Sequence, residues 1–247
     1  RENIVSKKKL VLSLLLVIVL TLTGCLKVGQ ENTNSDQIAK KGEKKKRIEF
    51  KDPNLEAAVR EAIEKEKGPI YKSDVRNLIS LDASSKGIKS LEGIQHLFNL
   101  GELEIDHNKI KDISPVATLT DLEILDFSNN KVRDISPLAG LVNLTGLYFN
   151  SNQVEDISPL SKINGVRGVL FNNNKVKDIS PLSDITSLRR VFFNNNKVKD
   201  ISSLVKNKEL GKKDKIKKKN NNLDLTNGSK DLKNIRVLKK RGAKIEY

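Results

Sequence analysis

The sequence contains one cysteine, two histidines and no tryptophan, and each scarcity excludes a class of protein. A single cysteine cannot form an internal disulfide, so the chain is not a disulfide-stapled scaffold. The two histidines, His96 and His107, have no metal-ligand spacing, and we expect His107 to be a surface residue. The sequence also has no glycine-rich phosphate loop and no nucleophile elbow. We therefore predict that the protein is not an enzyme and that it uses no cofactor and no metal.

The formal net charge of +15 is unevenly distributed along the chain. Residues 48–205 contain 20 basic and 22 acidic residues, which gives −2, so the positive excess lies mainly in residues 1–24, 40–47 and 206–219. The lysine run at 206–219 has no interleaved aromatic residue for base stacking, and we predict no nucleic-acid partner. These lysines can instead attract an anionic envelope polymer or lipid, or form a solvated loop.

The first residues have the layout of a secretory signal: a basic stretch, an apolar run and then small residues. An uncleaved membrane anchor is the alternative. The segment "LTGC" at 22–25 resembles the bacterial lipobox, which implies that Cys25 is lipidated and becomes the mature N-terminus. We therefore predict a signal peptide over 1–24 and a flexible, lipid-anchored tether over 25–47. The protein would be exported and held on the outer face of the bacterial cytoplasmic membrane.

A 22-residue repeat dominates the rest of the sequence, as in "NNNKVKDISPL" at 172–182 and "NNNKVKDISSL" at 194–204. Before each repeated asparagine comes Leu-x-x-Leu-x-Phe or a close variant, and apolar residues follow at intervals of about three. This spacing is the leucine-rich-repeat pattern, in which stacked coils share one apolar core. The repeated asparagines are Asn108, Asn130, Asn152, Asn174 and Asn196.

These asparagines should form an inward ladder, because their side chains can bond backbone groups of their own and the next coil. We expect the first two asparagines of each triplet to face outward and only the third to have a structural role. Each Ser-Pro pair, such as Ser136-Pro137, should start a short helical turn, with the serine as N-cap and the proline as the first helical residue.

The array resembles the internalin-like class of bacterial leucine-rich-repeat proteins, whose units read "LxxLxxLxLxxNxIxDIxPL". The resemblance implies an α/β solenoid shaped as a horseshoe, with a parallel sheet on the concave face and helical turns on the convex face. We predict a helical N-terminal cap over 48–77, repeats over 78–219 and an α/β C-terminal cap over 220–247. The coil at 205–222 departs from the pattern, with Lys218 in the phenylalanine position and Asn221 in the ladder position.

The concave face is defined by the side chains that alternate with the buried strand residues. Its central column is Glu104, Asp126, Tyr148, Leu170 and Phe192; one flanking column is Glu102, Ile124, Gly146, Gly168 and Arg190; the other is Asp106, Ser128, Asn150, Asn172 and Asn194. The face begins acidic and becomes apolar and aromatic. We expect Tyr148, Leu170 and Phe192 to be exposed neighbours.

A contiguous exposed apolar patch of this kind usually marks an interaction site. The alternative is that the patch packs on the tether or a terminal segment. We predict a monomeric surface lipoprotein that binds an unidentified protein through this face, and the resemblance implies a role in adhesion or host contact. An envelope scaffold, or a binder of anionic envelope polymer through the basic segments, is the alternative function.

Overall fold

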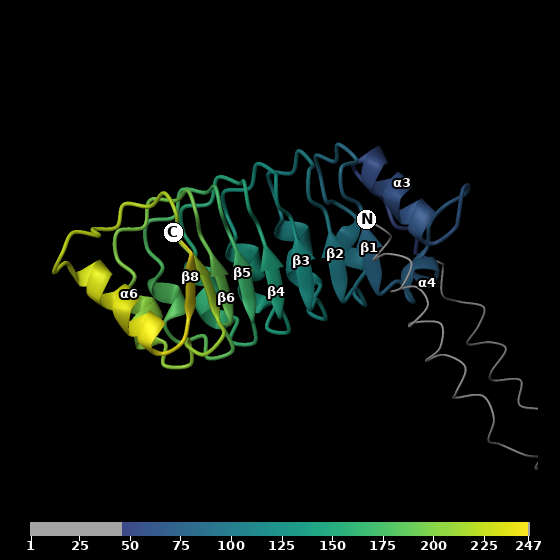
Figure 1. Cartoon of the computed structure of the whole chain (residues 1–247). Coiled ribbons are helices and arrows are strands. Elements are labelled where there is room, and N and C mark those ends of the chain that lie inside the picture. The colour runs from purple at the N-terminus through teal and green to yellow at the C-terminus, as the bar shows by residue number, and fades with distance from the viewer. Residues whose placement is uncertain (1–45, 247) are drawn as a thin grey trace, which may run out of the picture. The chain divides into compact units, whose positions relative to one another are not determined.

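The structure is a computed structural model that describes residues 46–246, so the predicted signal, Cys25 and nearly all of the tether lie outside it. Within this range the chain forms stacked coils, and each coil contributes one short strand to a parallel sheet of eight strands (Figure 1). The strands are β1 (Ser80–Asp82), β2 (Glu102–Glu104), β3 (Ile124–Asp126), β4 (Gly146–Tyr148), β5 (Gly168–Leu170), β6 (Arg190–Phe192), β7 (Lys215–Lys217) and β8 (Lys244–Glu246).

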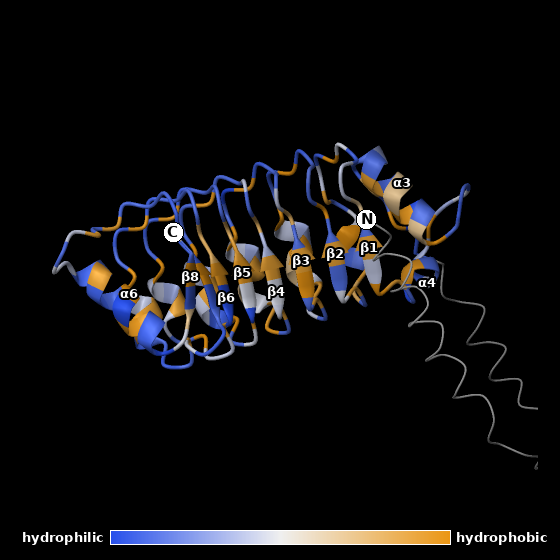
Figure 2. Cartoon of the chain, viewed as in Figure 1, coloured by the Kyte–Doolittle hydropathy of each residue, from blue (hydrophilic) through white to orange (hydrophobic). Residues whose placement is uncertain are grey.

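The strands pair in sequence order from β1 to β8, which confirms the predicted solenoid. From β1 to β6 the register advances by 22 residues per coil, so that Leu103 pairs with Leu125 and Leu125 with Leu147. These central strand residues are buried, while the residues on either side of each point to the concave face. Figure 2 shows apolar residues in the strands and largely hydrophilic loops along the upper edge of the array.

A column of phenylalanines forms the centre of the core. Phe127, Phe149, Phe171 and Phe193 are fully buried, and consecutive rings stack with centroids 5.6, 5.5 and 5.9 Å apart. Such stacking contributes about 0.5–1.5 kcal/mol per pair beyond the burial of apolar area. One coil alone could not bury these rings, so the core is a property of the stack.

The convex turns are mainly short 3₁₀ helices: η1 (Ile94–His96), η2 (Ser114–Thr118), η3 (Ser136–Gly140), η4 (Ser158–Lys162) and η5 (Ser180–Leu182). The prediction of a serine N-cap is wrong. In η3 the serine is already the first helical residue, and the preceding Asp134 accepts hydrogen bonds from the Ser136 amide (2.8 Å) and hydroxyl (2.9 Å). Aspartate side chains stabilise such turns by bonding the backbone two residues on.

Two α-helices lie at opposite ends of the array (Figure 1). Helix α3 (Pro53–Ala62) begins after Asp52, whose carboxylate accepts from the Asn54 amide at 2.9 Å and from the Lys89 amide at 2.6 Å. Helix α6 (Lys230–Lys240) begins after Ser229 and buries Ile235 and Leu238. Both helices contribute side chains to the common core. Residues 46–246 contain two shorter α-helices besides these, α4 (Lys72–Val75) and α5 (Ser202–Lys206).

The irregular coil at 205–222 keeps the repeat geometry despite its extra residues. The register between β6 and β7 pairs Arg190 with Lys215, and two of the basic residues of this segment, Lys215 and Lys217, are part of β7 itself. Lys218 is only 4% exposed. Its burial lowers its pKa, Lys239 lowers it further, and Asp231 acts in the opposite direction. Residues 215–218 are therefore part of the folded array, which contradicts the solvated-loop alternative for them.

Over residues 46–246, none of the helices has the length and apolar character that crossing a bilayer requires.

Candidate protein-binding face

The central column of the concave face changes character along the array. The sheet register places Tyr148 beside Leu170, and Leu170 beside Phe192. The three residues are neighbours as expected, but their side chains are half-buried, so they are less exposed than expected. The cause at one end is coverage by a neighbour, because the Lys217 Nζ lies 4.9 Å from the centre of the Phe192 ring.

Two glycines lie in a flanking column, and one of them makes room for a neighbouring side chain. A Cβ on Gly146 would lie 3.0 Å from the Tyr148 hydroxyl oxygen, closer than nearly all real Cβ contacts. A Cβ on Gly168 would lie 3.5 Å from the Arg190 Nε, which is ordinary contact. The absence of a side chain at 146 therefore lets the Tyr148 ring lie over its own strand. Glycine inside a strand is the sequence signal for such a close approach, and its role here was missed.

The β1–β3 end of the concave face is acidic. Burial raises the pKa of Glu104, and the neighbouring carboxylates of Glu102, Asp82, Asp106 and Asp126 raise it further. Burial also raises the pKa of Asp126. Negative charge is crowded at this end, because the sheet register places Asp82, Glu104 and Asp126 in one column. A cationic group of a partner would relieve that crowding.

Asp106 differs from these carboxylates, although burial acts to raise its pKa too. The Asp106 carboxylate accepts a hydrogen bond from the Ser84 hydroxyl and shares another with the His107 Nδ1. Together these bonds outweigh the effect of burial, so the pKa of Asp106 lies below its usual range. The His107 side chain is 60% exposed, which agrees with its expected surface position. Across residues 46–246, no group of three or more histidines, cysteines or carboxylates is arranged to hold a metal ion.

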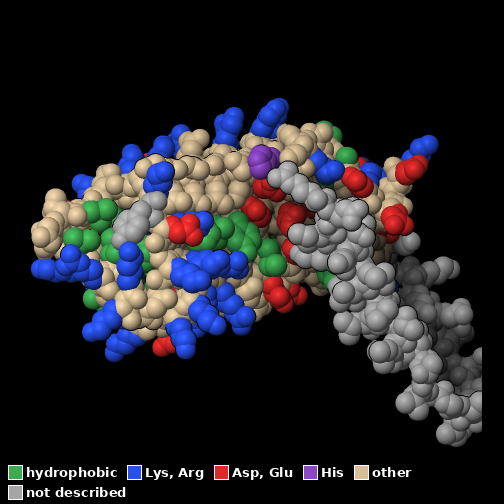
Figure 3. Space-filling model, viewed as in Figure 1, with side chains coloured by type: hydrophobic (Ala, Val, Ile, Leu, Met, Phe, Trp, Pro, Cys, Tyr) green, Lys and Arg blue, Asp and Glu red, His purple; other side chains and the backbone are tan. Residues whose placement is uncertain are grey.

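The β6–β8 end of the concave face carries cations. Arg190, Lys215 and Lys244 are exposed and occupy one column of the sheet, while Lys217 forms an ion pair with Glu246 at 2.7 Å. Figure 3 shows apolar side chains between an acidic group and a basic group on this face of the molecule. The structure thus brings the predicted site residues onto one continuous face, with Lys215 and Lys217 as members that sequence reasoning missed.

The repeated asparagines lie behind the concave face and tie successive coils together. The Asn152 Oδ1 accepts from the Val132 amide at 2.9 Å, and its Nδ2 donates to the carbonyl oxygens of Phe127 (3.0 Å), Phe149 (3.2 Å) and Asn150 (3.3 Å). The bonds outside its own coil go to the preceding coil and not, as expected, to the next one. The members of this buried set are Asn108, Asn130, Asn152, Asn174 and Asn196.

The other asparagines of each triplet also have structural roles, which corrects the expectation that only the third does. Asn172 donates through Nδ2 to the Asn150 Oδ1 at 2.7 Å, and Asn195 donates likewise to the Asn173 Oδ1 at 2.6 Å. Asn173 and Asn195 also adopt φ of 57° and 55°. Asparagine tolerates this left-handed conformation better than most residues, and that preference could have predicted the role.

Comparison with known proteins places these repeats in a family. The family model "Leucine Rich repeats (2 copies)" matches residues 120–162 and 166–206. The crystal structure of internalin C2 from Listeria monocytogenes is 31% identical to this chain, covers 73% of it and is covered over 91% of its own length, with a TM-score of 0.56. A second Listeria monocytogenes internalin, the product of inlF, is 26% identical and covers 80% of this chain, with a TM-score of 0.60.

The chain spans 65% of the length of that second internalin. A leucine-rich-repeat protein from Leptospira interrogans shares the fold alone. It is 17% identical, covers 72% of this chain and is covered over 51% of its own length, with a TM-score of 0.57. No curated protein matches the chain. The repeat model, the parallel sheet and the likeness to internalin C2 agree, and the chain belongs to the internalin-type family of bacterial leucine-rich-repeat proteins.

Proposed function

We propose that this protein binds a protein partner through its concave face, and that it does so at the bacterial surface in adhesion or host contact. The observation that carries the proposal is the run of Tyr148, Leu170 and Phe192 on adjacent strands, each half-buried and in register with the next. Aromatic side chains at the centre of an interface commonly supply most of the binding energy. Their preformed arrangement reduces the entropy lost on binding.

The distribution of charge favours a partner of defined orientation. Glu104 and Asp126 lie on one side of the apolar run, and Arg190 and Lys215 lie on the other. A partner that presents cations toward β2 and β3 and carboxylates toward β6 and β7 would complement both ends. Such complementarity mainly increases the association rate and rejects partners of the wrong charge pattern.

We also propose that Cys25 anchors the protein by lipid on the outer face of the cytoplasmic membrane. Cys25 lies outside the described residues, so this proposal is supported by the order of the basic, apolar and "LTGC" segments. Each buried CH₂ of an acyl chain contributes about 0.8 kcal/mol to membrane binding, and two chains give firm anchoring.

The concave-face proposal is tested by affinity capture with the paired variant Tyr148→Ala plus Phe192→Ala. The matched control is Val142→Ala, because Val142 is 56% exposed but lies in the turn before β4, outside the concave face. A partner captured by the wild type and the control but lost from the paired variant supports the proposal. Equal capture by all three proteins, with unchanged circular dichroism, contradicts it.

The same capture separates adhesion from an envelope scaffold. Extracts of host cells and of the bacterium's own envelope are compared in parallel. Adhesion predicts that the concave-face partner comes from the host extract, whereas a scaffold predicts that it comes from the envelope.

The anchor is tested separately with Cys25→Ser. We expect this variant to be released into the medium or to remain unprocessed, and to incorporate no radiolabelled fatty acid. Continued labelling of the variant would exclude Cys25 as the acyl acceptor.

A further inference from the structure

A second charged surface lies outside the concave face, on the segments that follow the buried asparagines. Two neighbouring hollows open there, of about 600 Å³ and about 330 Å³. The larger is lined by Lys111, Lys131, Arg133, Asp134 and Gln153, and the smaller by Lys89, Lys109, Lys111 and Lys131. Because the two share Lys111 and Lys131, they form one continuous depression across four coils, here called the lysine trough.

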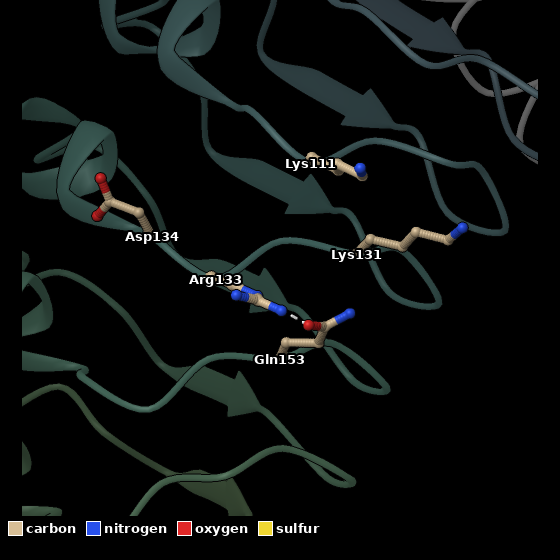
Figure 4. Close-up of a pocket in the computed structure, with 5 residues that line it drawn as sticks. All are labelled: Lys111, Lys131, Arg133, Asp134 and Gln153. Carbon is tan, nitrogen blue, oxygen red and sulfur yellow. Dashed lines mark hydrogen bonds between the residues drawn. The ribbon is translucent and has the colours of Figure 1, made fainter.

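The cations of the lysine trough form no ion pair with the part of the chain that the structure describes. Within residues 46–246, no carboxylate lies within 4.0 Å of the ammonium groups of its four lysines or of the Arg133 guanidinium. The one lining carboxylate, Asp134, is already used by the Ser136 amide and hydroxyl. Figure 4 shows Asp134 directed away from the lysines, toward the helical turn.

The trough also has a fixed edge. Arg133 donates through Nε to the Gln153 Oε1 at 2.8 Å, which holds the guanidinium at the boundary between two coils (Figure 4). In the next coil the position of Arg133 is taken by Glu155, whose carboxylate lies 3.8 Å from the Lys175 Nζ. The row of cations is therefore interrupted at Glu155, and lysines recur at the same repeat positions in the following coils, at Lys175, Lys177, Lys197 and Lys199.

We propose that the lysine trough binds a linear phosphodiester polymer, laid across successive coils. Stacked coils repeat every ~4.8 Å at the sheet, so the trough presents cations at short, regular intervals, which suits a chain of closely spaced anions. An open depression fits a chain that runs across it better than it fits an enclosed small molecule. Lysine binds phosphate as a point charge, whereas arginine favours a planar geometry with two parallel hydrogen bonds.

This site is independent of the proposed protein-binding function, because none of its residues lies on the concave face. It is also distinct from the basic segment at 206–219, in which residues 215–217 form β7 and Lys218 is buried. A phosphodiester polymer held in the trough would leave Tyr148 and Phe192 available to a protein partner.

The test measures binding of a fluorescently labelled synthetic glycerol phosphate oligomer to the full chain in detergent. Lys111→Gln plus Lys131→Gln should weaken binding roughly tenfold or more, since each lysine close to an anionic surface adds to the electrostatic attraction. It should also reduce the slope of log affinity against log salt by about one per lost contact. The control, Lys197→Gln plus Lys199→Gln, removes the same charge elsewhere and should change affinity less than about twofold.

Equal weakening by both variants would mean that binding follows net charge alone, and would overturn the proposal. Two competitors test the chemical class. Inorganic phosphate should not displace the oligomer at equal phosphate concentration, and poly-L-glutamate should displace it poorly. Displacement by free phosphate would reduce the trough to a single-anion site, and displacement by polyglutamate would remove the phosphodiester assignment. Either result leaves the capture experiment with the Tyr148 and Phe192 variants unaffected.

Discussion

Replacing Asn152 with alanine removes the hydrogen bonds that one buried asparagine makes between two coils. All three carbonyl oxygens it serves keep another donor. Asn130 bonds the Phe127 oxygen at 3.0 Å, Asn174 bonds the Phe149 oxygen at 2.9 Å, and the Asn129 amide bonds the Asn150 oxygen at 2.7 Å. Among residues 46–246, the Val132 amide donates only to the Asn152 Oδ1, at 2.9 Å. The substitution therefore leaves one buried N–H without an acceptor.

An unsatisfied buried polar group costs about 1–3 kcal/mol, and we expect Asn152→Ala to lower the free energy of unfolding by that amount. Asn152→Asp keeps an oxygen for the Val132 amide but turns a second one toward three carbonyl oxygens. At neutral pH this variant should be less stable than the alanine variant. Because burial among acceptors raises the pKa of the new carboxyl in the folded state, its penalty should shrink as the pH falls through that raised pKa.

Urea unfolding, followed by circular dichroism, measures both effects. The matched control is Asn143→Ala, an exposed asparagine that donates one bond to the Thr120 carbonyl of the preceding coil at 3.0 Å. Its loss should cost no more than about 0.5 kcal/mol. A midpoint for Asn152→Ala that equals the control's, or an aspartate variant as stable as the wild type, would refute the role assigned to this side chain.

Three further predictions concern the core and the carboxylates. Phe149→Ala should lower the free energy of unfolding by about 3–5 kcal/mol in the same assay, because it empties the centre of the phenylalanine column. A hydrogen bond from Lys230 and others from Ser202 lower the pKa of Asp200 to about 2, so the stability it contributes is present above pH ~4 and lost toward pH 2. Lys230→Gln should raise that pKa in an NMR titration, and an unchanged value would exclude the pair as the main cause. Glu102→Gln should lower the raised pKa of Glu104 in the same titration, since it removes one neighbouring negative charge.

The repeating part of the structure could be predicted from the sequence because each position recurs under the same physical demands. The 22-residue period fixed the register of β1 to β6 and identified Phe127, Phe149, Phe171 and Phe193 as core residues. Residues that differ from coil to coil, such as Tyr148 and Phe192, could be assigned to the concave face by alternation alone.

Details that depend on local competition between hydrogen bonds could not be predicted in this way. Asp134 and Ser136 are both good capping residues, and only the backbone geometry decides that the aspartate accepts the bonds. Whether Asn152 reaches the preceding or the following coil depends on the handedness and stagger of the stack. The half-burial of Phe192 depends on Lys217, which comes from the irregular coil whose geometry the repeat pattern does not specify.

Site-specific photocrosslinking tests the proposed function most directly. A photoreactive phenylalanine analogue is placed at position 148, on the concave face, and in a second variant at position 142, in the exposed turn before β4. We predict that a protein partner is crosslinked at position 148 and not at position 142, and that adding Phe192→Ala abolishes the adduct. An adduct formed equally at both positions, or at position 142 alone, would contradict binding through the concave face.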